Sequence, residues 1–324
     1  MQITHSLFVI FGGAPCRFFF PCSSMNHDVA TECLEAWRYI CNSPGKNIRS
    51  VLIDCFQQWM EISDEEVEAI KVIVGYLHNA SLLVDDIEDD SKLRRGKPVA
   101  HLVYGIPQTL NCANYVYFLA MEKCMALGSN ESLTVFTKEL LNLHRGQGRE
   151  LYWREHNLCP TEEQYLCMVK DKTGGLFRLA CGLMQSFSLN TSDFFPLCDS
   201  ISVYFQVRDD FINLASEEYH VNKSYCEDLS EGKYSFPIIH AIKESAPDDT
   251  RVISILKQRT ENVELKASVV EMLRKETKSF QYTRDYLGEI HRNVLSQIEQ
   301  LGGCPPLVEI MNKLNEDVDR CPCD

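Results

Sequence analysis

Apolar residues recur along most of the chain at the three- and four-residue spacing of an α-helix. One stretch, 64–77, follows Ser63, a favoured N-cap residue, and has acidic residues in its first turn. Other helical stretches cover 111–126, 132–144, 161–172, 175–188, 194–215, 252–257, 263–287 and 286–301, and a short last helix follows Pro306. Glycine and proline mark the breaks, and no segment alternates convincingly as a strand would. The pattern predicts an all-α protein.

The helical pattern runs from about residue 30 to residue 316 without a linker. It predicts one large single-domain helical bundle rather than two domains. Residues 1–29 are expected to be a leader and residues 317–324 a C-terminal tail. The first 24 residues hold one arginine and no acid, so they lack the charge of a secretory signal or a typical mitochondrial presequence. We expect a cytoplasmic protein, with the mitochondrion as the alternative if the leader is a presequence.

Composition narrows the class of protein further. The net charge of −14 argues against general nucleic-acid binding, because no basic stripe is available to displace phosphate counterions. No apolar run approaches the roughly 20 residues of a transmembrane helix, so we expect no membrane-spanning segment. The 15 cysteines are scattered and lack paired metal-binding spacing, which favours free thiols in a reducing compartment.

A first acidic cluster, Asp85, Asp86 and Asp89, directly follows an apolar helical stretch. Residues four apart lie on one helix face about 6 Å from each other, so Asp85 and Asp89 are expected to be stacked. Carboxylates this close repel unless a cation lies between them, and Mg²⁺ prefers such oxygen ligands. Because Arg94 and Arg95 follow within the next residues, the segment suits a magnesium–diphosphate complex better than a solvated helix end.

A second acidic cluster, Asp209 and Asp210, lies within a strongly apolar stretch. Gln206, Asp210 and Asn213 fall on one helical stripe, and Asp209 is one step round the helix. Buried carboxylates are costly unless they are paired or bound to metal. Arg208 offers a salt bridge as the alternative explanation for one of them. Basic residues beside glycine or proline breaks are candidates to converge on an anion: Lys46, Arg49, Lys172, Lys223 and Lys233.

At these positions the sequence resembles the trans-isoprenyl diphosphate synthases, and within them the animal and fungal geranylgeranyl diphosphate synthases. The family's D-D-x-x-D motif matches 85–89, its paired arginines match 94–95, and its D-D-x-x-N motif matches 209–213. The family's G-K-x-x-R, K-T and G-K-x-x-x-P motifs match 45–49, 172–173 and 232–237. The resemblance extends from about residue 30 to residue 315 and implies a helical bundle around a deep central cavity.

The resemblance also implies the roles of individual residues. Three Mg²⁺ ions would bind between the two clusters, with Asp85, Asp89 and Asp209 as metal ligands. The implied catalytic residues are Asp85, Asp86, Asp89, Lys172, Asp209 and Asp210. The allylic diphosphate would contact Arg94, Lys172, Thr173, Gln206, Lys223 and Lys233, and isopentenyl diphosphate would contact Lys46, Arg49, His78 and Arg95. The implied reaction condenses isopentenyl diphosphate with farnesyl diphosphate to geranylgeranyl diphosphate in a homo-oligomeric enzyme.

Product length is expected to depend on the side chains below the first acidic cluster. Ala80 and Ser81 precede Asp85 by five and four positions, where shorter-product relatives tend to carry large aromatic residues. Small residues there leave the shaft open and favour a C20 product over C15. Tyr117, Phe118 and His144 resemble a bulky set deeper in the shaft that would stop extension, although core packing explains them equally well.

Two other functions fit the same fold. A terpene synthase derived from this family would ionise the same substrate and release a volatile hydrocarbon without using isopentenyl diphosphate. The retained Lys46, Arg49, His78 and Arg95 favour condensation. A non-catalytic regulatory subunit of another synthase would be expected to have lost aspartates or lysines, and none is lost. The direction of Arg178, on the helix after Lys172, is left open by the sequence.

Overall fold

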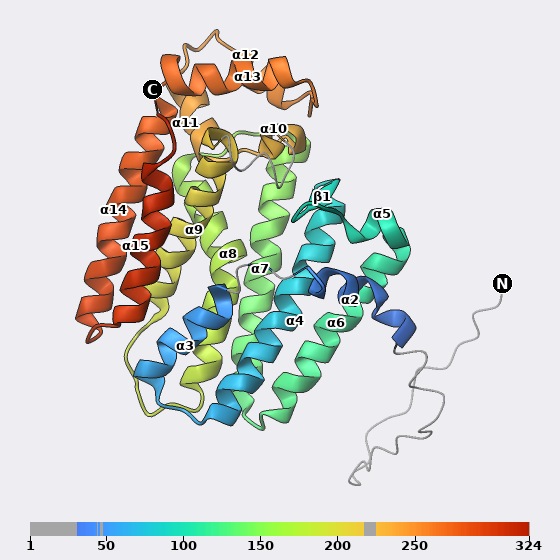
Figure 1. Ribbon diagram of the computed structural model, residues 1–324, viewed down its shortest axis with the longest axis vertical. Coiled ribbons are helices and arrows are strands. Elements are labelled where there is room, and N and C mark those ends of the chain that lie inside the picture. The colour runs from blue at the N-terminus through green and yellow to red at the C-terminus, as the bar shows by residue number, and fades with distance from the viewer. Residues whose placement is uncertain (1–30, 44, 46–47, 217–224, 324) are drawn as a thin grey trace, which may run out of the picture.

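A computed structural model describes residues 31–43, 45, 48–216 and 225–323 (Figure 1). The first part contains α2 (Glu35–Cys41), α3 (Ile48–Met60), α4 (Asp64–Glu88), β1 (Leu93–Arg94), β2 (Lys97–Pro98), α5 (Ala100–Tyr104) and α6 (Ile106–Ala126). The centre contains α7 (Asn130–His156), α8 (Glu162–Gln185) and α9 (Phe195–Ala215). The last part contains α10 (Glu227–Glu231), α11 (Phe236–Glu244), α12 (Arg251–Leu256), α13 (Val263–Glu271), the π-helix η2 (Met272–Glu276), α14 (Ser279–Gln300) and α15 (Pro305–Asp319).

The long helices form a bundle whose central members are α4, α7, α8 and α9. Helix α8 packs against α7, α9 and α4, so it lies between the two helices that carry the acidic clusters. Figure 1 shows α14 and α15 together along one side of α9, α6 beside α4, and α12 with α13 across one end of the bundle. Large buried side chains such as Tyr165, Tyr204 and Phe211 fill the interior. The expected all-α fold is confirmed.

Local sequence fixes the start of α4, which carries the first acidic cluster, and the start of α8, which packs against it. Helix α4 begins with a capping box at Ser63, and α8 begins with one at Thr161. In each box the cap side chain accepts from the backbone amide three residues later, and the side chain of that later residue accepts from the backbone amide of the cap. Helix α4 continues well beyond 77, up to the first acidic cluster. It is also long and apolar enough to meet the length and composition criterion for a membrane span, which the sequence analysis had not expected. A core helix of a bundle passes the same test, and α4 buries an apolar stripe against its neighbours.

Several boundaries differ from the prediction; α7, for example, continues to His156, well beyond the expected end at 144. The expected break at Gly174–Gly175 is absent, because both glycines lie inside α8 where neighbouring helices approach closely: a Cβ on Gly174 would lie 3.0 Å from Ser202 Oγ. The single helix expected over 263–287 is interrupted by η2 and by Lys278, which has a left-handed φ of 55°. The last helix extends to Asp319, beyond the expected start of the tail.

A hairpin that the sequence pattern did not predict, β1–β2, directly follows the first acidic cluster. Leu93 pairs with Pro98 and Arg94 with Lys97 in antiparallel register. The two turn residues, Arg95 and Gly96, have φ of 54° and 74°, as a two-residue hairpin turn requires. The strands are too short to show an alternating pattern. The hairpin matters for function because it holds the two arginines next to α4.

Candidate active site

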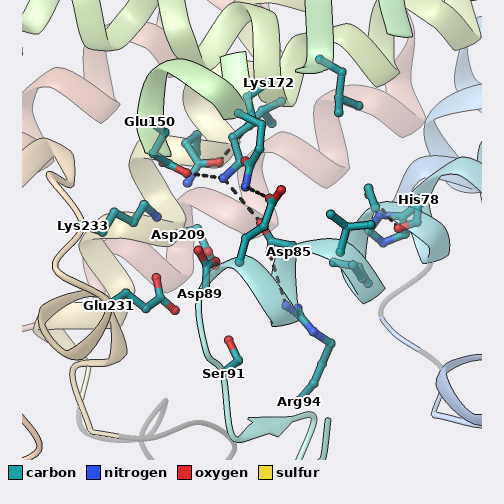
Figure 2. Close-up of a pocket in the computed structure, with 18 of the residues that line it drawn as sticks. His78, Asp85, Asp89, Ser91, Arg94, Glu150, Lys172, Asp209, Glu231 and Lys233 are labelled. Carbon is teal, nitrogen blue, oxygen red and sulfur yellow. Dashed lines mark hydrogen bonds and ion pairs between the residues drawn. The ribbon is translucent and has the colours of Figure 1, made fainter. Parts of the chain in front are cut away.

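A cavity of about 270 Å³ opens between α4, α7, α8 and α9 (Figure 2). Its charged lining includes carboxylates from four elements: Asp85, Glu88, Asp89, Glu150, Asp209, Glu227, Asp228 and Glu231. Its basic lining consists of Arg49, His78, Arg94, His144, Lys172 and Lys233. Residues far apart in the sequence are therefore gathered at one site, with both acidic clusters represented.

The first acidic cluster divides between the cavity and the protein interior. Asp85 and Asp89 line the cavity, on the last turn of α4 and at its C-cap. Asp86 points away, is 2 % exposed, and accepts a hydrogen bond from Arg94 Nε at 2.7 Å. Asp86 therefore holds Arg94 and is not part of the cavity lining, and the catalytic role expected for Asp86 stays a prediction. Burial, and then the charge of Asp85, raises the pKa of Asp89 to about 6.

The hairpin directs its two arginines to different places. Arg94 lines the cavity and also lies 3.4 Å from Asp85 Oδ2. Arg95 is not part of the cavity lining; it donates to the backbone carbonyl of Ser43 and packs on Gly45, where any Cβ would collide with its guanidinium. Arg95 thus lies beside the segment that resembles the G-K-x-x-R motif. Lys46 of that motif lies outside the described residues.

Arg49 and His78 form a cationic corner of the cavity. Arg49 Nη1 lies 3.1 Å from His78 Nε2, and Arg49 Nε is buried with no hydrogen-bond partner among the described residues. Burial, and then the charge of Arg49, lowers the pKa of His78 to about 2, so His78 is neutral and accepts from Arg49. Burial, and then Arg95, lowers the pKa of Arg49 to about 10. Three basic groups this crowded, with an unsatisfied buried donor, suit an anionic ligand.

The second acidic cluster divides in the same way as the first. Asp209 and Gln206 line the cavity. Asp210 is 0 % exposed and is not part of the cavity lining, and the catalytic role expected for Asp210 stays a prediction. Arg208 bonds to the carbonyl of Leu314 and, at 2.5 Å, to Asp317 of α15. The interpretation of Arg208 as the salt-bridge partner of this cluster is therefore wrong.

Two lysines line the cavity, and each pairs with carboxylates at one of the two acidic clusters. Lys172, on α8, pairs with Glu150 and lies 3.6 Å from Asp85 Oδ1 (Figure 2). Lys233 lies 2.9 Å from Asp210 Oδ1. Burial alone would lower the pKa of Lys172, but Glu150 and Asp85 outweigh burial and raise the pKa above its usual value. Asp210 and Asp228 likewise outweigh burial and raise the pKa of Lys233, so both ammonium groups are charged. Lys223 lies outside the described residues.

Sequence reasoning missed the contribution of α7. Glu150 holds Lys172, and Gln147 Nε2 donates to Glu88 at 2.7 Å. Arg154 donates to Asp89 Oδ1 at 2.5 Å and to the carbonyl of Glu88, so it fixes the end of α4. These polar residues recur at helical spacing along one face of α7. That spacing was the available signal, although a solvated face has the same pattern.

The residues expected to set product length are only partly brought together. Ser81, Tyr117 and His144 line the cavity, and the Tyr117 and His144 rings lie 5.7 Å apart. Ala80 is buried but is not part of the lining. Phe118 is 69 % exposed on α6, because one residue further along a helix turns the side chain about 100° from Tyr117. The expectation that Phe118 lies deep in the shaft is wrong for the described chain.

The carboxylates suit Mg²⁺ that arrives with a phosphate ligand. Among the described residues, no three Asp, Glu, His or Cys side chains are grouped so that they could hold a metal ion by themselves. Mg²⁺ usually takes only one or two carboxylates and completes its shell with water and substrate phosphates. Burial, and then the charge of Asp89, raises the pKa of Glu231 well above its usual value. Such crowding of negative charge is relieved by a divalent cation.

Comparison with known proteins agrees with this geometry. The polyprenyl synthetase family model matches residues 30–273. The chain belongs to the polyprenyl synthetase family. It is 50 % identical to a geranylgeranyl pyrophosphate synthase of Dictyostelium discoideum over 281 residues, which cover 87 % of this chain and 92 % of that protein. It is 49 % identical to the corresponding synthase of Mucor circinelloides f. lusitanicus over 274 residues, 85 % of this chain and 90 % of that protein.

A relative with a different name is as similar. The chain is 49 % identical to a protein named terpene synthase from Matsumurasca onukii over 292 residues, which cover 90 % of this chain and 96 % of that protein. Overall identity therefore does not separate the two activities. The expected resemblance to trans-isoprenyl diphosphate synthases is confirmed, and the chain is a prenyltransferase of this family.

Proposed function

We propose that the protein is a magnesium-dependent geranylgeranyl diphosphate synthase that joins isopentenyl diphosphate to farnesyl diphosphate. The observation that carries the proposal is that one cavity has two separate places for an anion. One is the cationic corner of Arg49 and His78. The other lies between Asp85 and Asp209, where bound Mg²⁺ would offset the carboxylates and Lys172 and Lys233 would add positive charge. A condensation of two diphosphates needs both places. Relatives named geranylgeranyl pyrophosphate synthase support the choice of product.

The side chains suit ionisation of an allylic diphosphate. Mg²⁺, which the family generally uses, would be held by Asp85, Asp89 and Asp209, with three ions per site, and would supply Lewis-acid neutralisation of the diphosphate. Lys172, Lys233 and Arg94 would stabilise the negative charge that grows on the leaving diphosphate as the C–O bond breaks.

The second half of the reaction takes place at the cationic corner. Arg49 and His78, with Arg95 and Lys46, would hold the diphosphate of isopentenyl diphosphate so that its double bond faces the allylic cation. A new C–C bond forms, and loss of one proton, to the departed diphosphate, restores the alkene. Holding both reactants in one cavity lowers the entropic cost of their encounter.

The product assay is the experiment that tests this function. Purified protein is incubated with Mg²⁺ and farnesyl diphosphate, with and without isopentenyl diphosphate, and the products are identified by mass spectrometry with headspace sampling. We expect geranylgeranyl diphosphate only when both substrates are present. Consumption of farnesyl diphosphate alone, with release of a hydrocarbon, would contradict the proposal and identify a terpene synthase, the second candidate that the Matsumurasca onukii relative favours.

We also propose a homo-oligomer in the cytoplasm. Exposed apolar side chains gather on α5 and α6 and support self-association: Leu102, Val103, Ile106, Leu110, Phe118, Met121 and Met125. An exposed apolar group of this kind is typical of an interaction surface. Light scattering in solution is expected to give the mass of at least a dimer, and a monomeric mass would contradict self-association.

Cysteine usage typical of a reducing compartment supports the cytoplasm, which localisation of a tagged full-length chain would test.

A further inference from the structure

Tyr165 is a buried side chain next to the cavity that the mechanism has not used. It lies in the first turn of α8, is 0 % exposed, and is not part of the cavity lining. Its hydroxyl donates to Asp210 Oδ2 at 2.5 Å, and its ring packs on Phe236 with a centroid distance of 5.6 Å. Burial, and then the charge of Asp210, raises the pKa of Tyr165, so its hydroxyl stays a donor.

Asp210 uses its two oxygens for different purposes. Oδ2 accepts from Tyr165 and from the backbone amide of Phe236, at 2.5 and 2.9 Å, and both donors belong to the buried scaffold. Oδ1 accepts from Lys233 Nζ at 2.9 Å and from Gln206 Nε2 at 3.0 Å, and both of these residues line the cavity. The scaffold donors therefore fix the orientation of the Asp210 carboxylate, and the carboxylate in turn orients the side chains of Lys233 and Gln206.

Asp210 also orients Thr173, because Gln206 lies between them and bonds to both. Because a carboxylate accepts and cannot donate, Asp210 requires the amide nitrogen of Gln206 to face it. The amide oxygen then faces Thr173, whose hydroxyl donates to it at 2.8 Å. One buried carboxylate thus sets the directions of Lys233, Gln206 and Thr173, three groups that line the cavity.

We propose that Tyr165 is a positioning residue for the diphosphate site, acting through Asp210 on Lys233, Gln206 and Thr173. Without its hydroxyl, Oδ2 would keep only the amide of Phe236, and the carboxylate could rotate. The proposal rests on the proposed function, because it assumes that these three groups face the allylic diphosphate. Displacement of Lys233, Gln206 and Thr173 would lower kcat, because these groups must lie close to the positions that the transition state requires.

The test is Tyr165→Phe, which removes the hydroxyl and keeps the ring. Tyr204→Phe is the matched control, because Tyr204 is equally buried and its hydroxyl bonds only at 3.3 Å to Asn315, away from the cavity. We expect Tyr165→Phe to lower kcat about tenfold while leaving the KM for isopentenyl diphosphate unchanged, and Tyr204→Phe to keep both constants. Unchanged kcat in Tyr165→Phe, or an equal loss in Tyr204→Phe, would overturn the proposal.

A second readout separates this proposal from the proposed function. Binding of inorganic pyrophosphate with Mg²⁺, followed by the rise in melting temperature, requires no condensation. We expect a smaller rise for Tyr165→Phe than for the unaltered chain and for Tyr204→Phe. If the unaltered chain forms no geranylgeranyl diphosphate but this difference is present, the proposed function fails and the positioning role stands. Equal rises in all three proteins would overturn the positioning role alone.

Discussion

Each acidic cluster contains one aspartate that is buried away from the cavity, while the other aspartates of the cluster line it. Asp85 and Asp209 line the cavity, whereas Asp86 and Asp210 are buried and bind Arg94 and Lys233. The spacing of the motifs predicted that the carboxylates would gather, since helical geometry follows from the sequence. It did not predict this division, which depends on basic residues brought in from β1 and from the segment after α10.

Lys172 gives the most direct prediction at the level of one residue. Lys172→Ala removes a charged group that lies between Glu150 and Asp85 and faces the cavity. We expect kcat to fall by about 10²-fold or more, because a preorganised charge at the leaving group is lost. Lys170→Ala is the control, since Lys170 is exposed on the same helix. Steady-state kinetics of both variants check this, and equal activities would exclude Lys172 from the mechanism.

The packing contact between α7 and α8, called the seam below, helps to position Lys172 in the site. A Cβ on Gly146 would lie 2.8 Å from Lys172 Cα and 2.9 Å from Lys172 Cβ. Glycine is therefore required here because it lets α7 come close to the backbone that carries Lys172. The same close approach explains why a glycine stands at 175 inside α8, since a Cβ there would meet Leu143 of α7. A single sequence does not distinguish such glycines from helix breaks.

Gly146→Ala is expected to push α7 away from Lys172. Overpacking of this kind costs about 1–3 kcal/mol of unfolding free energy, and we expect activity to fall because Lys172 is displaced. Gly148→Ala is the matched control, since a Cβ at Gly148 would meet nothing within 4 Å and alanine favours the helix. Thermal melting and kcat are the measurements. A Gly146→Ala protein as stable and active as the control would show that the seam can relax.

The sequence left open the direction in which the Arg178 side chain points. Its side chain points away from the cavity into the junction of three helices, where it lies 2.8 Å from Glu139 of α7 and 2.5 Å from Asp199 of α9. The charge is therefore paired within the scaffold of the site. Neither partner is near Arg178 in sequence, so only the packing of α7, α8 and α9 could reveal the pairing.

At the scale of the molecule, the bundle brings two acidic clusters from distant parts of the chain to one cavity. Helix type and the two motifs could be predicted because both depend on local spacing. The outward position of Phe118, the pairing of Arg208 with α15 and the polar face of α7 could not, because they depend on which helices become neighbours. The central claim is that Asp85 and Asp209 together hold a magnesium–diphosphate complex.

Calorimetric titration of inorganic pyrophosphate, with and without Mg²⁺, tests this claim most directly. The proteins are the unaltered chain, Asp85→Asn, Asp209→Asn and the control Asp90→Asn, whose side chain is 81 % exposed and pairs with Lys92. We predict magnesium-dependent binding that weakens at least about tenfold in each of the first two variants and is unchanged in the control. Wild-type affinity in either Asp85→Asn or Asp209→Asn would contradict the account.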